Sequence, residues 1–192
     1  MPEYHPDLLT FLIPLSEREL SLRQALDRLE SIGNADDEVP VIVRLMENPA
    51  FDFPPFSMFK GRVSLIQHDC IHLLLGRGTT LIDEAFTIGF TMGSSNEMST
   101  LASKLFGYVA GRWYPKAYRF PASAQRVYSD AVHLGMVSGC QALEEVDFEP
   151  FMEYTLPELR AELGLESGLL RAYYEVEARR NPKSAASQRL LG

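Results

Sequence analysis

The chain has 192 residues, of which 46% are hydrophobic and 23% are charged, and its formal net charge is −8. This composition excludes a disordered chain and a coiled coil, and the length predicts one folded domain. No apolar run reaches the roughly 18 residues of a membrane-spanning helix, and the first residues lack signal-peptide features, so we expect a cytoplasmic protein. Two cysteines without a CxxC pair predict no disulfide framework. The acidic balance argues against nucleic acid as a partner.

Helical periodicity dominates the sequence and strand-like alternation is weak, which predicts an all-α fold. We expect a single-domain helical bundle over residues 1–166, in which 1–15 form an N-terminal arm, followed by a C-terminal helix and frayed tail over 167–192. The first helix is expected to begin at the capping signature Ser16–Glu19. In chain order, the predicted helices cover residues 16–33, 39–46, 59–75, 80–90, 97–114, 121–136, 155–164 and the part of 167–192 that precedes Pro182.

Two histidines lie four residues apart on the helix predicted over 59–75. On a helical wheel His68, His72 and Asp69 fall at about 0°, 40° and 100°, so they share one face. Glu84 follows in the next predicted helix, and a helix reversal at Gly76–Gly78 would bring it back over the histidines. Two imidazoles with carboxylates suit zinc, iron or manganese. The sequence therefore predicts a metal site at His68, Asp69, His72 and Glu84, with zinc favoured.

A histidine on an apolar helix is more often a hydrogen-bonded core residue than a metal ligand. Apolar residues surround this motif, however, and each unpaired polar group buried there would cost about 1–3 kcal/mol. The coincidence of two histidines with nearby carboxylates therefore favours a bound cation. Asp83 is interpreted as an anion in the first turn of the helix that follows Thr80, in preference to a further ligand.

Two separated motifs resemble those of the ubiquinone (coenzyme Q) biosynthesis protein family, and the chain is similar to a bacterial-type member. The first motif is His68-Asp69-x-x-His72, followed by eleven residues and Glu84, with HLLLGRGTT over 72–80. The second is the segment LPELRAELGL over 156–165. The resemblance spans about residues 60–165 and is weak over 92–124. The chain departs from the family pattern at Asp83, where glycine is usual.

The resemblance implies a helical fold with an apolar lipid tunnel beside a metal bound by His68, Asp69, His72 and Glu84. It also implies oxidative decarboxylation of the ring carboxylate of a polyprenyl hydroxybenzoate. The expected partners are a prenylated aromatic or isoprenoid lipid, an anionic membrane surface and other quinone-biosynthesis enzymes. The open alternative is a non-catalytic, metal-stabilised scaffold that binds prenyl lipids for those enzymes, and a homodimer is also left open.

Residues 98–129 contain no acidic side chain. Basic residues there are interleaved with aromatic ones, a pattern typical of an interface with anionic lipid headgroups. We predict headgroup contact by Arg112, Trp113, Lys116 and Arg119, and peripheral association with the inner face of the membrane. An ordinary solvated helix face with core aromatics is the alternative.

Other metal-dependent classes fit the motif less well. An HD-type phosphohydrolase would need a further upstream histidine, and the only one is His5 in the predicted arm. A zinc peptidase would place glutamate directly after the first histidine, where Asp69 stands. His133 lies on a separate predicted helix, and no spacing connects it with the motif.

Overall fold

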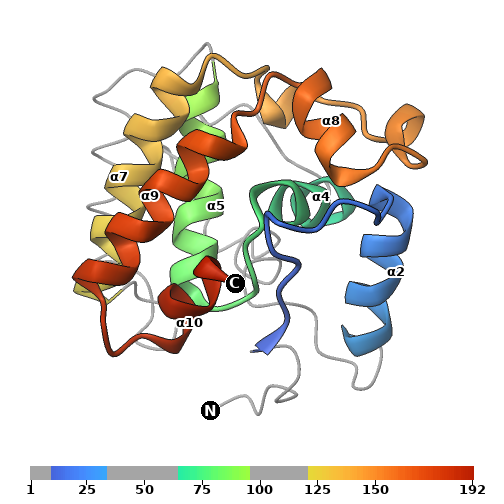
Figure 1. The fold of residues 1–192 in the computed structure, drawn as a ribbon. Helices are drawn as coiled ribbons and strands as arrows, with labels where there is room; N and C mark the ends of the chain where they lie inside the picture. Colours follow the sequence, from blue (N-terminus) through green and yellow to red (C-terminus); the bar gives the residue numbers. More distant parts are fainter. Residues whose placement is uncertain (1–9, 34–64, 96–120) are drawn as a thin grey trace, which may run out of the picture.

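The computed structural model describes residues 10–33, 65–95 and 121–192, and all regular elements in these ranges are helical (Figure 1). Three short 3-10 turns accompany the α-helices. The all-α prediction is confirmed, and the helices pack as a bundle around one hydrophobic core. The elements are α2 (Leu22–Gly33), α4 (Leu65–Leu75), α5 (Leu81–Ser94), α7 (Ala122–Ser138), η2 (Leu143–Glu145), η3 (Glu149–Phe151), α8 (Leu156–Glu162), α9 (Ser167–Arg180), α10 (Ala185–Gln188) and η4 (Arg189–Leu191).

Helix α4 lies near the centre of the fold, with α5, α7 and α9 on one side and α2 on the other (Figure 1). Both α2 and α8 contact α4. The stretch from Cys70 to Leu75 is almost completely inaccessible to solvent. A helical stretch that is covered on all sides is expected to be apolar around its whole circumference. The histidines of α4 are therefore polar exceptions inside the core.

Helices α5 and α7 pack at unusually short range because glycines line their contact. A Cβ atom built on Gly93 would lie 2.1 Å from the Val132 carbonyl oxygen, and one on Gly135 would lie 2.4 Å from that of Phe90. Backbone therefore packs directly on backbone, and no larger residue fits without separating the helices. This contact fixes the position of α5, which contributes Glu84 to the predicted metal site.

The C-terminal segment differs from the predicted frayed tail. Helix α9 forms as expected, but after Asn181 the chain continues into α10 and η4. The Ser187 hydroxyl donates to Glu177, 2.9 Å away, and the Gln188 side chain donates to the Ala178 carbonyl at 2.8 Å. Helix α9 ends before Pro182, as predicted. The bonds to α9 hold the turns that follow in place, so the prediction of fraying is wrong.

The start of the first predicted helix, over 16–33, also differs from the prediction. The helix begins at Leu22, and the reciprocal bonds of its first turn join Ser21 and Gln24, which replaces the capping signature predicted at Ser16–Glu19. The Glu17 carboxylate instead accepts backbone amides in the turn before the helix. The end of the predicted arm, residues 11–15, packs alternate side chains into the core.

Several predictions fall on residues outside the described ranges. These are the helices over 39–46 and 97–114 and the headgroup contacts at Arg112, Trp113, Lys116 and Arg119. Most of the acid-free segment 98–129, which we call the basic aromatic window, is also outside these ranges. Among the described helices, none combines the length and the apolar character needed to cross a membrane.

The glycine contact predicts the effect of adding one methyl group. We expect Gly93→Ala to lower the free energy of unfolding by about 1–3 kcal/mol, because the new Cβ would press on the Val132 carbonyl. The matched control is Gly168→Ala in α9, where a Cβ meets no atom within 4 Å. That change should raise stability by up to about 1 kcal/mol. Denaturant titration measures both values, and equal stabilities would contradict the close packing.

Candidate metal centre

Helix α4 ends in a Schellman motif that sets the turn into α5. Gly76 has a φ of 63°, a left-handed conformation that favours glycine. The amide of Gly76 donates to the Leu73 carbonyl at 3.2 Å, and the amide of Arg77 donates to the His72 carbonyl at 2.9 Å. The helix therefore stops one turn after His72, and the chain reverses toward α5.

Two side chains from the C-terminal part of the chain complete the end of α4. The buried guanidinium of Arg160, on α8, donates to the carbonyls of Leu74 at 2.8 Å and Leu73 at 3.3 Å. The Tyr174 hydroxyl, on α9, donates to the Leu75 carbonyl. The last carbonyls of a helix have no partner within the helix, so the bonds to Leu74 and Leu75 satisfy groups that burial would otherwise leave unpaired. The Leu73 carbonyl, which accepts the Gly76 amide, gains a second donor.

The next helix, α5, begins after Thr80 with an acidic first turn. The Asp83 carboxylate accepts the Thr80 backbone amide at 3.2 Å and its hydroxyl at 2.6 Å. Asp83 is thus the anion of the helix start, as the sequence predicts. Glu84, one residue further, faces α4.

The reversal brings Glu84 over both histidines. The Glu84 Oε2 atom lies 3.1 Å from His68 Nε2 and 3.2 Å from His72 Nε2, and the two nitrogens are 2.9 Å apart. We call these three residues the triad. The exposed fractions of their side chains are 9%, 4% and 12% for His68, His72 and Glu84. Three lone-pair-bearing atoms therefore converge on one point with almost no access to water.

The electrostatics of the triad follow from this convergence. Burial alone would raise the pKa of Glu84, but the two imidazoles hold it well below its usual range. Burial opposes the charged form of His72, yet the Glu84 carboxylate outweighs that effect and raises the pKa of the imidazole above its ordinary value. The carboxylate is thus ionised and needs a positive partner, which is either a proton on the imidazoles or a cation.

Thr87, one turn after Glu84, contacts the other nitrogen of His72. Its hydroxyl oxygen lies 3.3 Å from His72 Nδ1 and is completely buried. If Nδ1 carries the proton and donates it to this oxygen, Nε2 presents its lone pair to the triad. Thr87 is not among the residues predicted from the sequence, although its place one turn from Glu84 could have suggested it.

Asp69 is placed differently from the other three predicted ligands. The three atoms that lie within 4.8 Å of one another belong to His68, His72 and Glu84, and Asp69 does not join this group. Burial raises the pKa of Asp69 to about 6, against the opposing effect of the two imidazoles. It therefore lies close enough to affect the triad electrostatically. Its role as a fourth ligand stays a prediction.

The geometry of the triad fits a small divalent cation. Tetrahedral zinc with bonds of about 2.0–2.1 Å separates its ligand atoms by about 3.3 Å. The observed separations of 2.9, 3.1 and 3.2 Å are shorter by a few tenths of an ångström at most. Two imidazole nitrogens and one carboxylate oxygen are also a donor set that catalytic zinc and non-haem iron(II) sites use.

Other candidate residues lie away from the triad. Cys70 is fully buried among apolar side chains, where burial raises the pKa of its thiol to about 12, and Cys140 is half-buried. His133 is exposed on α7. Within the described ranges no apolar tunnel beside the triad is shown, so the tunnel also stays a prediction.

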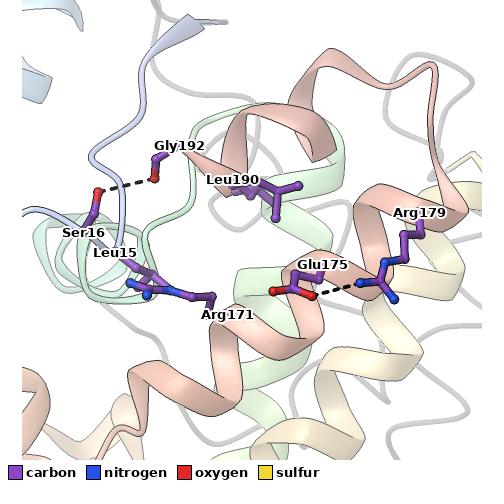
Figure 2. Close-up of a pocket in the computed structure, with 8 residues that line it drawn as sticks. Leu15, Ser16, Arg171, Glu175, Arg179, Leu190 and Gly192 are labelled. Atoms are coloured by element: carbon purple, nitrogen blue, oxygen red, sulfur yellow. Dashed lines mark hydrogen bonds and ion pairs between the residues drawn. The ribbon is translucent and has the colours of Figure 1, made fainter.

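A pocket of about 470 Å³ lies between α9, the C-terminal turn and the segment before α2 (Figure 2). Figure 2 shows Arg171, Glu175 and Arg179 reaching it from α9. Arg179 is already paired with Glu175 at 3.1 Å. No triad residue lines this pocket, so it is not the tunnel that the resemblance implies.

Comparison of the chain with protein-family models, with curated proteins and with solved structures finds no match. The resemblance to the ubiquinone biosynthesis family therefore rests on the two sequence motifs. The structure adds that one residue of the second motif, Arg160, caps the helix that carries the first.

The raised pKa of Asp69 predicts that replacing this carboxylate increases the free energy of unfolding by an amount that depends on pH. A folded-state pKa of about 6 exceeds the ordinary value of 3.8, so the contribution of Asp69 to stability is present below pH 3.8 and is lost as the pH rises through 6. Asp69→Asn should therefore stabilise the metal-free protein at pH 7.5, by at most about 3 kcal/mol, and much less at pH 4.

Chemical denaturation at both pH values in the presence of a chelator measures this difference. Asp27→Asn on α2 is the control, because Asp27 is exposed. If the two variants shift stability by the same amount at both pH values, the buried environment assigned to Asp69 is wrong.

Proposed function

We propose that the triad binds a divalent metal ion. The observation that carries the proposal is the convergence of His68 Nε2, His72 Nε2 and Glu84 Oε2 within about 3 Å of one another in the core. Without a cation, two ring nitrogens 2.9 Å apart must share a proton beside the carboxylate. A cation satisfies all three lone pairs at once, which avoids the cost of burying unpaired polar groups.

Each residue of the site has a distinct task in this proposal. The histidines supply neutral nitrogens, Thr87 fixes the ring of His72, and Glu84 supplies the negative charge that balances part of the ion. A bound divalent ion supplies Lewis-acid chemistry or, if it is iron, redox chemistry. Three protein ligands leave a coordination position for Asp69, water or a substrate oxygen.

For the reaction, we propose oxidative decarboxylation of the ring carboxylate of a polyprenyl hydroxybenzoate. In this reaction the ring carbon loses carbon dioxide and gains a hydroxyl. One atom of dioxygen enters that hydroxyl and the other leaves as water, with two protons and two electrons from a reductant. The two sequence motifs support the substrate class. The pair of histidines with one carboxylate supports the oxidative step, because non-haem iron(II) oxygenases use that set.

One observation favours a second candidate, a non-catalytic scaffold that binds prenyl lipids for partner enzymes. The triad side chains are at most 12% exposed, and a closed environment is typical of structural metal sites. In both cases the partners are a prenylated lipid and other quinone-biosynthesis enzymes. The two candidates differ in whether the protein itself catalyses the decarboxylation.

The metal proposal predicts the effect of removing one imidazole. Purified wild-type protein should contain about one divalent ion per chain, and His72→Ala should lose most of it, because two ligands cannot replace three in a buried site. Elemental analysis measures the stoichiometry.

The wild-type protein should also release carbon dioxide from a polyprenylated hydroxybenzoate with dioxygen and ascorbate, and the His72→Ala variant should not.

His133→Ala is the matched control, since His133 is an exposed histidine on α7, and it should keep both the metal and the activity. Full metal content in His72→Ala would contradict the assignment of the triad. Metal retention in the wild type without any carbon dioxide release would reject the decarboxylase and support the scaffold.

We further propose that the protein associates peripherally with an anionic membrane surface through the basic aromatic window. Sedimentation with anionic liposomes should be strong at low salt and should weaken as salt rises, because headgroup attraction is screened. Lys116→Glu should weaken binding, while Lys183→Glu, a charge reversal outside the window, should not. Failure to sediment at low salt would contradict this part of the proposal.

A further inference from the structure

The C-terminal turns reach back across the fold to the first turn of α5. Arg189 opens η4, and its Nη2 atom lies 2.6 Å from Asp83 Oδ2. The Asp83 side chain is fully buried, and that of Arg189 is 19% exposed. A charge-assisted bond of this length in a poorly solvated place is among the stronger polar contacts in proteins. The contact joins residues 106 positions apart in the sequence.

The turn between α4 and α5 leaves room for this arginine. A Cβ atom built on Gly78 would lie 2.1 Å from Arg189 Nη2 and 2.5 Å from the Phe11 carbonyl oxygen. The guanidinium therefore occupies the space that a side chain at Gly78 would fill. It lies against the turn and the helix start together.

A second arginine, Arg77, also packs at the turn between α4 and α5. Arg77 forms two bonds with Glu177 of α9, and its guanidinium lies over the rings of both Phe86 and Tyr174, 3.8 and 4.2 Å from their centres. Its Nη1 atom is 3.7 Å from Asp83 Oδ1, which is too long for a hydrogen bond. Arg77 therefore cannot replace the short contact that Arg189 makes with Asp83.

Asp83 and Glu84 are neighbours in the first turn of α5. A shift of this turn by a few tenths of an ångström would move the Glu84 carboxylate relative to the imidazoles on α4. If Arg189 is lost, the buried Asp83 carboxylate keeps Thr80 as its close donor but loses its short contact with a cation. An undercompensated buried charge is costly, so the first turn would rearrange toward solvent or toward Arg77.

We propose that Arg189 is a positioning residue for Glu84. Arg189 acts on Glu84 through Asp83, and the C-terminal turns are therefore part of the metal centre. Its predicted effect on metal affinity rests on the proposed function of the triad. Its predicted effect on the first turn of α5 does not, because the Arg189–Asp83 contact exists without an ion.

Two measurements on the full-length chain test this proposal. The first is the affinity for Co²⁺, followed by visible absorption at a temperature where circular dichroism shows every variant folded. The second is hydrogen–deuterium exchange of peptides that cover residues 80–87 in chelator-treated protein. Arg189→Ala should bind Co²⁺ about tenfold more weakly and exchange faster over residues 80–87. Arg189→Lys, which keeps the charge, should recover part of both properties.

The matched control is Arg179→Ala, which removes an exposed arginine of α9 and should change neither measurement. Wild-type affinity and wild-type exchange in Arg189→Ala would overturn the proposal. Faster exchange spread evenly over all helices, with unchanged affinity, would also overturn it, because it would show general destabilisation. If the wild type binds no Co²⁺, the proposed function of the triad fails, and exchange over residues 80–87 alone decides the role of Arg189.

Discussion

The structure depends on one reversal of the chain, the turn that brings Glu84 back over His68 and His72. A helix alone can present two histidines, but it cannot supply a third ligand atom at the same point. The left-handed Gly76 ends α4 within one turn of His72, and the acidic start of α5 follows directly. The short connection leaves little freedom in where Glu84 lies, so the three atoms of the triad are held close together without a bound ion.

Most long-range polar contacts of this turn come from the C-terminal part of the chain. Arg160 and Tyr174 satisfy the last carbonyls of α4, Glu177 pairs with Arg77, and Arg189 pairs with Asp83. Buried ion pairs contribute little net stability, because desolvation offsets their attraction, but removing one partner is costly. Such contacts specify one arrangement of the turn more than they stabilise the fold. This accounts for the presence of several charged residues in the core of a chain with an ordinary globular composition.

The local features of the site could be predicted from the sequence. Helical spacing predicts that His68 and His72 share a face, and the glycines after Leu75 predict the turn, because both effects act over a few residues. The burial of Arg160 could not be predicted, since its partner Leu74 is 86 positions away and an arginine on a short amphipathic helix is usually exposed. The tail was misjudged for the same reason: a proline predicts a break, but not the contacts with α9 that order the chain after it. The helical wheel places Asp69 on the same face as the histidines, and the structure leaves it outside the triad, so its role as a fourth ligand stays a prediction.

X-ray absorption at the edge of the metal that the purified protein contains is the decisive measurement on the triad. We expect nitrogen and oxygen neighbours at about 2.0–2.2 Å from the metal, with the multiple scattering of two imidazoles and no sulfur. Spectra of the wild type that show cysteine sulfur in the first shell, or no imidazole scattering, would contradict the claim that His68, His72 and Glu84 form a metal centre.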